Sequence, residues 1–305
     1  SSVFAENLTE LAKEDETICA ITAAMKNGTG LQGFADRFPD RFFDVGIAEE
    51  HAVTFAAGLA HDRALPVFAV YSTFLQRSYD QILNDAAIGK EHIVLAIDRA
   101  GIVGDDGETH QGVFDVAFLN TIPGVSVYSP SCFAELRINL KQAIYDEDGV
   151  AAVRYPRGGE LPGLEGYEPD YQPYTLWETP GAETLLVTYG RIFATVREAS
   201  RRLNEAGKPV SVLKLTRIRP LDPDSIRAAL SYKRILFFEE GIRSGGVCER
   251  FGAKLLNASY RGLYQPVAID TFVPACKPER GLAANGLDLA GILAAVQRRM
   301  PDAAE

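Results

Sequence analysis

The first residue that could do chemistry is an acid at the start of an otherwise apolar helical segment. An apolar run ending at Val45 indicates the edge of a strand. From Ala48 onward apolar residues recur at helical spacing, which places Glu49 in the first helical turn. The helix dipole alone often favours an acid there. This helix has little polar surface, and Gly58 is expected to pack closely, so we expect its start to be buried. A buried ionised carboxylate requires a partner, either a side chain or a ligand.

An aromatic turn and a glycine-rich loop follow two predicted strands. Tyr71, Phe74 and Arg77 come after the strand 65–70, where core packing and a helix cap would be sufficient explanations. The loop 98–112 contains four glycines together with Asp106 and His110. Long loops of this kind are costly to order and are usually functional in compact domains. A histidine that shares such a loop with an aspartate indicates proton transfer.

Arginines mark the same loop and the end of a later strand. Arg99 lies at the start of the loop, and Arg154 and Arg157 end the strand 150–154. Surface ion pairs are the simplest interpretation, and a clamp with Arg99 for a phosphate or carboxylate is the alternative. The residues by themselves therefore indicate a small phosphorylated or carboxylated ligand and leave the reaction open.

Composition limits the classes of function. The chain has 305 residues, 47% hydrophobic and 24% charged, enough for two domains of about 150 residues each. A net charge of -10 argues against a nucleic-acid or anionic-membrane surface, and no apolar run is long enough to span a bilayer. The four cysteines lack paired-ligand spacing, which predicts reduced thiols in a cytoplasmic protein. Motifs of nucleotide hydrolysis, dinucleotide binding, serine hydrolysis and zinc proteolysis are also missing.

Strands and helices alternate along the chain, which is typical of parallel sheets covered by helices on both faces. The predicted strands are 17–22, 65–70, 93–97, 125–128, 150–154, 184–188, 209–215, 234–239 and 267–270. The predicted helices are 4–13, 73–88, 134–145, 193–206, 225–230, 245–257 and 289–299. Periodicity is lost after residue 158, so we expect an α/β domain over 1–158, a linker over 159–181 and a smaller α/β domain over 182–305. Ligands in such sheets bind beyond the carboxyl ends of strands, where the residues above lie.

Five stretches together carry a resemblance to a known family. They are 44–54, 71–77, 97–104, 106–112 and 153–158. In order and spacing they resemble the second half of the 1-deoxy-D-xylulose-5-phosphate synthases, which belong to the thiamine-diphosphate enzymes of transketolase type. The resemblance spans nearly the whole chain and is strongest over 18–158. It implies a transketolase-like pyrimidine-binding domain followed by a transketolase C-terminal domain.

The resemblance implies a cofactor role for four residues. Glu49 matches the glutamate that hydrogen-bonds the pyrimidine ring of thiamine diphosphate and favours the imino tautomer, which removes the proton from C2 of the thiazolium ring. Phe74 matches the aromatic residue that stacks on the pyrimidine, and Tyr71 and Arg77 line the same pocket. Glu50 departs from the family, which usually has glutamine there.

The resemblance also implies substrate roles in the glycine-rich loop and at the domain's end. Arg99 and Arg157 match the arginines that hold the phosphate of glyceraldehyde 3-phosphate. His110 and Asp106 match residues beside the reacting carbons, which orient substrate and move protons.

The implied activity is the condensation of pyruvate and D-glyceraldehyde 3-phosphate to 1-deoxy-D-xylulose 5-phosphate with loss of CO2, a precursor of isoprenoids, thiamine and pyridoxal. The family's amino-terminal half, which binds Mg2+ and the diphosphate, is missing from the sequence. We therefore expect a fragment or subunit that binds no metal itself, needs that half in cis or in trans, is inactive alone, and works in a cytoplasmic homodimer. The alternatives are a transketolase-like or 2-oxo-acid dehydrogenase β-type subunit, and a non-catalytic dimerisation module.

Overall fold

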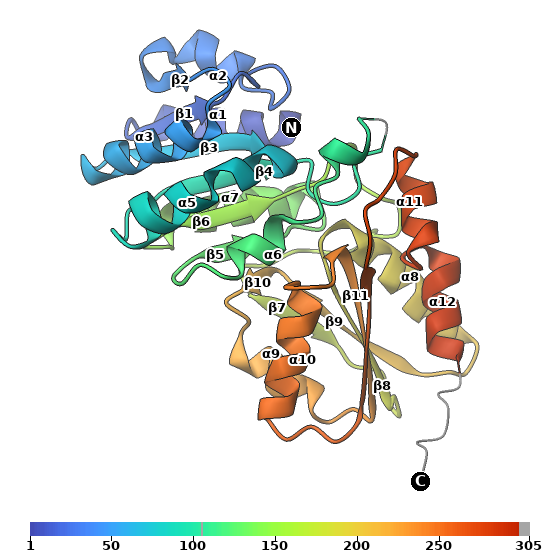
Figure 1. Ribbon diagram of the computed structural model, residues 1–305. Helices are drawn as coiled ribbons and strands as arrows, with labels where there is room; N and C mark the ends of the chain where they lie inside the picture. The colour runs from blue at the N-terminus through green and yellow to red at the C-terminus, as the bar shows by residue number, and fades with distance from the viewer. Residues whose placement is uncertain (105, 299–305) are drawn as a thin grey trace.

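Two helix-covered β-sheets make up the protein (Figure 1), as seen in a computed structural model that describes residues 1–104 and 106–298. The first sheet has seven strands in the order β10-β5-β6-β4-β3-β1-β2, and the second has five in the order β12-β11-β8-β9-β7. Every neighbouring pair is parallel except β10 with β5 and β7 with β9. The predicted α/β class, with two mostly parallel sheets, is confirmed.

The strands of the described chain are β1 (Ile18–Thr22), β2 (Phe42–Asp44), β3 (Leu65–Tyr71), β4 (Val94–Asp98), β5 (Ser126–Tyr128), β6 (Ala151–Arg154), β7 (Tyr174–Trp177), β8 (Thr184–Tyr189), β9 (Val210–Leu215), β10 (Arg217–Arg219), β11 (Arg234–Ile242) and β12 (Leu263–Ile269). The α-helices are α1 (Ser2–Glu14), α2 (Gln32–Arg37), α3 (Glu49–His61), α4 (Ser72–Leu75), α5 (Tyr79–Gln81), α6 (Asp115–Leu119), α7 (Phe133–Tyr145), α8 (Phe193–Glu205), α9 (Pro223–Ala229), α10 (Val247–Asn257), α11 (Pro278–Ala284) and α12 (Leu289–Gln297). Shorter helical segments are η1 (Pro39–Arg41), η2 (Gln76–Ser78), η3 (Ile82–Ala87), η4 (Glu108–His110) and η5 (Gly190–Ile192).

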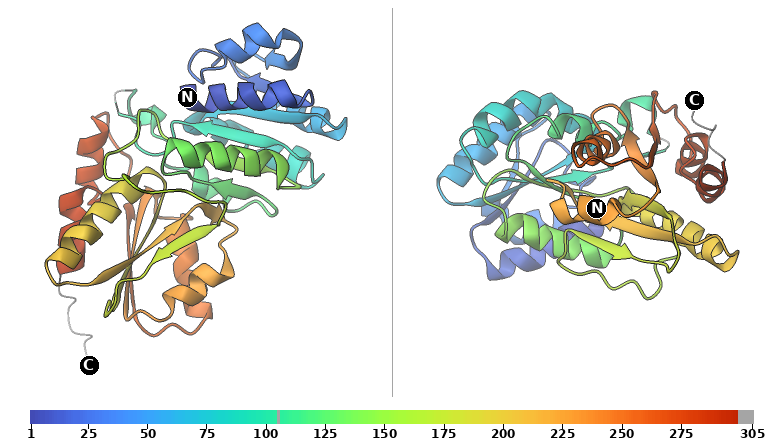
Figure 2. Two further views of the ribbon diagram at one scale, coloured as in Figure 1. Left: turned by 180° about the vertical axis from the view of Figure 1, so that it is seen from behind. Right: turned by 90° about the horizontal axis from the view of Figure 1, so that it is seen from below.

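Helices cover both faces of each sheet (Figures 1 and 2). On the first sheet, α1 and α7 pack on one face, while α3 and the segments from α4 to η3 pack on the other. On the second sheet, α8 and α12 share one core and α9 and α10 another. The central strands β1 and β4 are buried along their whole length, because both of their faces are covered.

Helix α3 presents one face to the first sheet. Its buried residues recur every three or four positions: Glu49, Ala52, Val53, Ala56 and Ala57. This stripe confirms that the helix start is buried. The expected close packing at Gly58 is wrong, because that residue is exposed and a Cβ added to it would meet nothing within 4 Å.

Two short strands escaped prediction. β7 lies inside the predicted linker and pairs antiparallel with β9. β10 follows β9 along the chain but crosses to the first sheet, where it pairs antiparallel with β5. Each is an edge strand of three or four residues, too short for an apolar pattern to reveal.

One hydrophobic cluster runs through both sheets. It contains Val127 and Ala152 of the first sheet as well as Leu185, Leu213 and Phe237 of the second. The two domains therefore share a core. No helix of residues 1–104 and 106–298 is long and apolar enough to cross a membrane. The last helix, predicted for 289–299, ends at Gln297, and its predicted final residue, Arg299, lies outside the described residues.

Candidate active site

Glu49 begins α3 with an incompletely satisfied carboxylate. Its side chain is only 3% exposed, and its Oε2 lies 3.3 Å from Nη1 of Arg77. No group in the described chain donates a hydrogen bond to this oxygen. A buried carboxylate oxygen that lacks a hydrogen bond is costly unless another donor reaches it.

Arg77 only partly offsets the negative charge of Glu49, because its guanidinium also lies near Glu50 and is partly exposed to solvent. Its side chain is 49% exposed, and its Nε also lies 3.9 Å from Oε1 of Glu50. Ion pairs with that much solvent contribute little. Glu50 itself is 44% exposed, so the two adjacent acids differ sharply in environment. Ile47, two residues before Glu49, is 76% exposed and presents an apolar side chain beside the site.

Three aromatic rings line the turn that follows β3. The rings of Tyr71 and Phe74 stack with centroids 5.7 Å apart, and the edge of His110 meets Phe74 at 5.3 Å. Because Phe74 and Arg77 are three residues apart in consecutive helical segments, they lie on neighbouring positions of one surface. The hydroxyl oxygen of Thr109 lies 3.0 Å from Nδ1 of His110. The carbonyl oxygen of Thr109 accepts a 2.6 Å hydrogen bond from the hydroxyl of Thr73. These contacts hold the imidazole against the aromatic wall.

Two arginines converge on Asp106. The carboxylate accepts hydrogen bonds from Nη1 of Arg157 at 2.8 Å and Nη1 of Arg99 at 3.3 Å. The guanidinium carbon of Arg99 also lies 3.7 Å from the ring centroid of Tyr71, a cation–π contact that joins this cluster to the aromatic wall. Burial raises the pKa of Tyr71, and the positive charge of Arg99 partly opposes that shift. Arg99 and Arg157 thus already share one oxyanion.

Arg154 does not join this cluster. It is buried and makes a bidentate ion pair with Asp115, with Nε donating at 2.7 Å and Nη2 at 3.2 Å. Burial alone would lower the pKa of Arg154, but the Asp115 carboxylate reverses that effect and holds it above its usual value. Of the two arginines that end β6, only Arg157 is available to a ligand.

The loop from Arg99 to Gly112 is pinned at its neck. Gly101 and Gly112 exchange two backbone hydrogen bonds of 2.6 and 2.8 Å. Gly101 has a φ of +86°, and a Cβ on Gly112 would collide with the carbonyl oxygen of Arg99. Glycine is needed at both positions, one for its backbone conformation and one for the close approach.

The structure thus brings the predicted residues into two neighbouring groups. One holds Tyr71, Phe74, His110, Arg99, Asp106 and Arg157, and the other holds Glu49 and Arg77. Sequence reasoning missed Thr73 and Thr109, which hold His110, and the bridging position of Asp106. For Thr73 and Thr109, the one signal in the sequence was the position of Thr109 next to His110.

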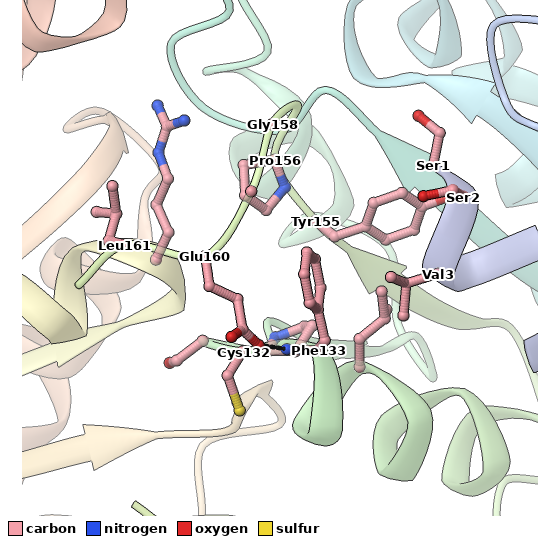
Figure 3. Close-up of a pocket in the computed structure, with 15 residues that line it drawn as sticks. Ser1, Ser2, Val3, Cys132, Phe133, Tyr155, Pro156, Gly158, Glu160 and Leu161 are labelled. Atoms are coloured by element: carbon pink, nitrogen blue, oxygen red, sulfur yellow. Dashed lines mark hydrogen bonds between the residues drawn. The ribbon is translucent and has the colours of Figure 1, made fainter. Parts of the chain in front are cut away.

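The enclosed cavity drawn in Figure 3 is not this site. It has a volume of about 60 Å³ and lies between α1, the start of α7 and the segment after β6. None of the eight predicted residues lines it. Arg99 instead faces an open groove of about 850 Å³ beside α1 and α2. In the part of the chain that the structure describes, no group of three or more His, Cys, Asp or Glu side chains is arranged to hold a metal ion.

Comparison with known protein families agrees with this fold. Residues 1–159 match the pyrimidine-binding domain of transketolase, and residues 174–294 match the transketolase C-terminal domain. The chain belongs to the transketolase family.

Within that family, two similar curated proteins are named 1-deoxy-D-xylulose-5-phosphate synthase. The one from Clostridium kluyveri is 48% identical over 81% of this chain and 40% of its own length. The one from Clostridium perfringens strain 13 is 40% identical over 96% of this chain and 48% of its own length. The chain therefore spans less than half the length of these relatives.

Solved structures show the same architecture. One, described as a split gene transketolase in an inactive beta4 tetramer, has a TM-score of 0.86 and 26% identity, covering 97% of this chain and 96% of that chain. The transketolase of Campylobacter jejuni, at 18% identity, has a TM-score of 0.79 over 97% of this chain and 46% of its own and shares the fold.

Proposed function

We propose that this chain supplies one wall of the active site of a thiamine-diphosphate-dependent transferase. Its reaction is the condensation of pyruvate with D-glyceraldehyde 3-phosphate to 1-deoxy-D-xylulose 5-phosphate and CO2. The buried Oε2 of Glu49, which accepts no hydrogen bond within the described chain, is the observation that carries the proposal. The names of relatives at 40–48% identity support the synthase over a transketolase, because the split gene transketolase is only 26% identical to this chain.

The residues present fit the cofactor's pyrimidine. Glu49 would receive a hydrogen bond from a ring nitrogen at its free oxygen, and the face of Phe74 would stack on the ring. Tyr71 would support Phe74 by stacking on it, and Arg77 would place a positive charge beside Glu49 at the mouth of the site. When bound, thiamine diphosphate would supply the carbon nucleophile for the keto group of pyruvate.

The residues of the second group act on the substrates. Arg99 and Arg157 hold the phosphate of the aldehyde substrate by charge-assisted hydrogen bonds, for which Asp106 must give up its place. His110, fixed by Thr109 against Phe74, exchanges a proton with the substrate oxygen as the new carbon–carbon bond forms. Asp106, once displaced from the arginines, would orient the bound substrate.

The proposal includes a second half and self-association. The Mg2+ and diphosphate site belongs to the segment that the longer relatives have in addition, attached to this chain or separate from it. The exposed side chain of Ile47, two residues before Glu49, would be covered by that segment. The neighbour described as a beta4 tetramer supports assembly of copies of this chain. The form that we propose is a homodimer in a cytoplasmic enzyme. Sedimentation as a monomer of the assembled enzyme at micromolar concentration would contradict this part.

The activity is tested with the missing half supplied. The protein, combined with the amino-terminal half of a curated relative, is given thiamine diphosphate, Mg2+, pyruvate and glyceraldehyde 3-phosphate. We expect release of CO2 coupled to formation of 1-deoxy-D-xylulose 5-phosphate. Activity with sugar-phosphate donors alone would instead establish a transketolase.

The role of Glu49 is tested by Glu49→Gln, which keeps the shape and removes the charge. We expect a loss of at least about 100-fold in kcat, the usual scale for a group that promotes proton transfer. Glu50→Gln is the matched control, because Glu50 adjoins Glu49 and also lies near Arg77 but is exposed. Its kcat should stay within about two-fold of the parent. Equal losses in the two variants would refute the role given to Glu49.

A further inference from the structure

The loop that carries Arg99, Asp106 and His110 is held by the second domain as well as the first. Ile102 lies three residues after Arg99, at the neck of this loop. Its backbone N–H donates a 2.7 Å hydrogen bond to Oε1 of Glu240 in β11. Its carbonyl accepts a 2.8 Å hydrogen bond from Nη2 of Arg191 in η5. Both polar groups of one loop residue are therefore satisfied by the other domain.

Arg191 and Glu240 also bind each other. Nε of Arg191 donates to Oε2 of Glu240 at 2.9 Å, and Nη2 donates to Oε1. Their side chains are only 11% and 7% exposed, so the pair is shielded from water and fixed in direction. Truncation of either partner alone would leave a buried charge.

Two further close contacts fix the position of the loop against the second domain. A Cβ on Gly101 would lie 2.5 Å from Oε1 of Glu240, so the backbone approaches the carboxylate as closely as glycine allows. The side chain of Ile102 packs against α11, where a Cβ on Gly281 would lie 2.9 Å from its Cγ2. In Figure 1 the loop lies beside the upper end of α11, away from the first sheet.

We propose that the Arg191–Glu240 pair is a positioning clamp through which the second domain sets the geometry of the phosphate-binding arginine Arg99. The inference rests on the proposed function, because it assigns the clamp to the phosphorylated substrate of that reaction. Arg99 has a φ of +60° and lies just before the clamped neck of the loop. Its guanidinium contacts the Asp106 carboxylate, where the phosphate would bind. If Ile102 were released, the backbone that directs this guanidinium would become free to move. Arg191 and Glu240 touch neither substrate nor cofactor in this account.

The test uses Arg191→Met/Glu240→Leu, which removes both charges and both contacts to Ile102 and leaves no unpaired ion. The matched control is Lys214→Met/Glu135→Leu. It removes a second buried ion pair, which joins α7 to β9 and does not contact the loop. Arg191→Lys is a milder variant that keeps the charge but loses the planar fork.

The first readout is hydrogen exchange at the amides of Ile102 and Val103 in the full chain, with no cofactor needed. We expect exchange about 10-fold faster or more in the clamp variant, an intermediate rate in Arg191→Lys, and no local change in the control beyond its global loss of stability. Unchanged protection of Ile102 in the clamp variant would overturn the clamp, whatever the enzyme's reaction.

The second readout is substrate discrimination by the assembled enzyme. The ratio of kcat/KM for glyceraldehyde 3-phosphate to that for unphosphorylated glyceraldehyde should fall about 10-fold in the clamp variant, mainly through KM, since a misdirected Arg99 weakens binding of the phosphate. The ratio should hold in the control. An unchanged ratio in an active clamp variant would refute the positioning role, whereas inactivity of the parent protein would refute the proposed function and leave the exchange result to decide the clamp.

Discussion

At the residue scale, Asp106 places a carboxylate between two arginines where the phosphate of the proposed substrate would bind. Under the proposed function, this internal acid would compete with the ligand, and opening the site would require exchange of one anion for another. The contacts of 2.8 and 3.3 Å are both made by one oxygen, Oδ2, which leaves the pair easier to break than a bidentate one.

Asp106→Asn should strengthen binding of inorganic phosphate, because the amide keeps the shape of the side chain but removes the competing charge. For a partly exposed pair worth about 1 kcal/mol, affinity should rise roughly five-fold. Titration calorimetry at constant ionic strength measures the effect. Asp270→Asn is the control, since Asp270 pairs with Arg243 on the second domain. Weaker or unchanged binding in Asp106→Asn would show that the two arginines are not a phosphate site.

Sequence reasoning succeeded for residues defined by local pattern and failed where partners are distant. The burial of Glu49 followed from the apolar stripe of its own helix. Arg154 and Arg157 looked equivalent, because the partner that separates them, Asp115, is 39 residues away in the chain. Asp106 was expected near the reacting carbons, and its contact with Arg157 across 51 residues was equally invisible to local spacing.

At the element scale, α7 and β9 are joined by an ion pair in the dry junction between the domains. Lys214 of β9 bonds Glu135 of α7, which also accepts hydrogen bonds from Tyr167 at 3.0 Å and the amide of Ser131 at 2.7 Å. Burial lowers the pKa of Lys214, and Glu135 opposes that shift only in part. Removal of one partner is therefore costly, because the other remains as a buried unpaired charge, whereas removal of both leaves no such charge.

Lys214→Met should destabilise the protein by about 3–5 kcal/mol, because Glu135 is left as a buried unpaired charge. Lys214→Met/Glu135→Leu should recover a large part of that loss, since no charge then remains. Urea unfolding at neutral pH measures both free energies. A double variant less stable than the single one would mean that the ion pair itself, rather than the avoidance of an isolated charge, stabilises the junction.

Helices and strands could be predicted from the sequence where a run of apolar residues marks a buried element. β4 is buried at all five positions and was predicted within one residue of its bounds. The predicted helix 73–88 is instead a succession of α4, η2, α5 and η3, a difference that apolar spacing does not distinguish. β7 and β10 exist because a neighbouring strand pairs with them, and that pairing leaves no periodic trace in three or four residues.

At the scale of the whole molecule, the two sheets should unfold together. They share a hydrophobic cluster, and β10 ties the second half of the chain into the first sheet. Trp177 is the chain's only tryptophan and stacks on Phe193 at 5.2 Å, so its fluorescence reports on the second domain. In urea, its midpoint should coincide with that of the far-ultraviolet circular dichroism, which reports on both. Two separated transitions would show that the shared core does not couple the domains.

The place of β10 in the first sheet also bears on the order in which the protein is made. Residues 217–219 leave the ribosome only after β8, α8 and β9 have been synthesised, yet they complete a sheet whose other six strands end at Arg154. Until then the nascent chain carries an open edge at β5 on the translating ribosome, the kind of strand that pairs with other chains. The edge at β5 therefore stays unpaired until β10 has been synthesised. During that time a chaperone or the adjoining polypeptide would have to shield it.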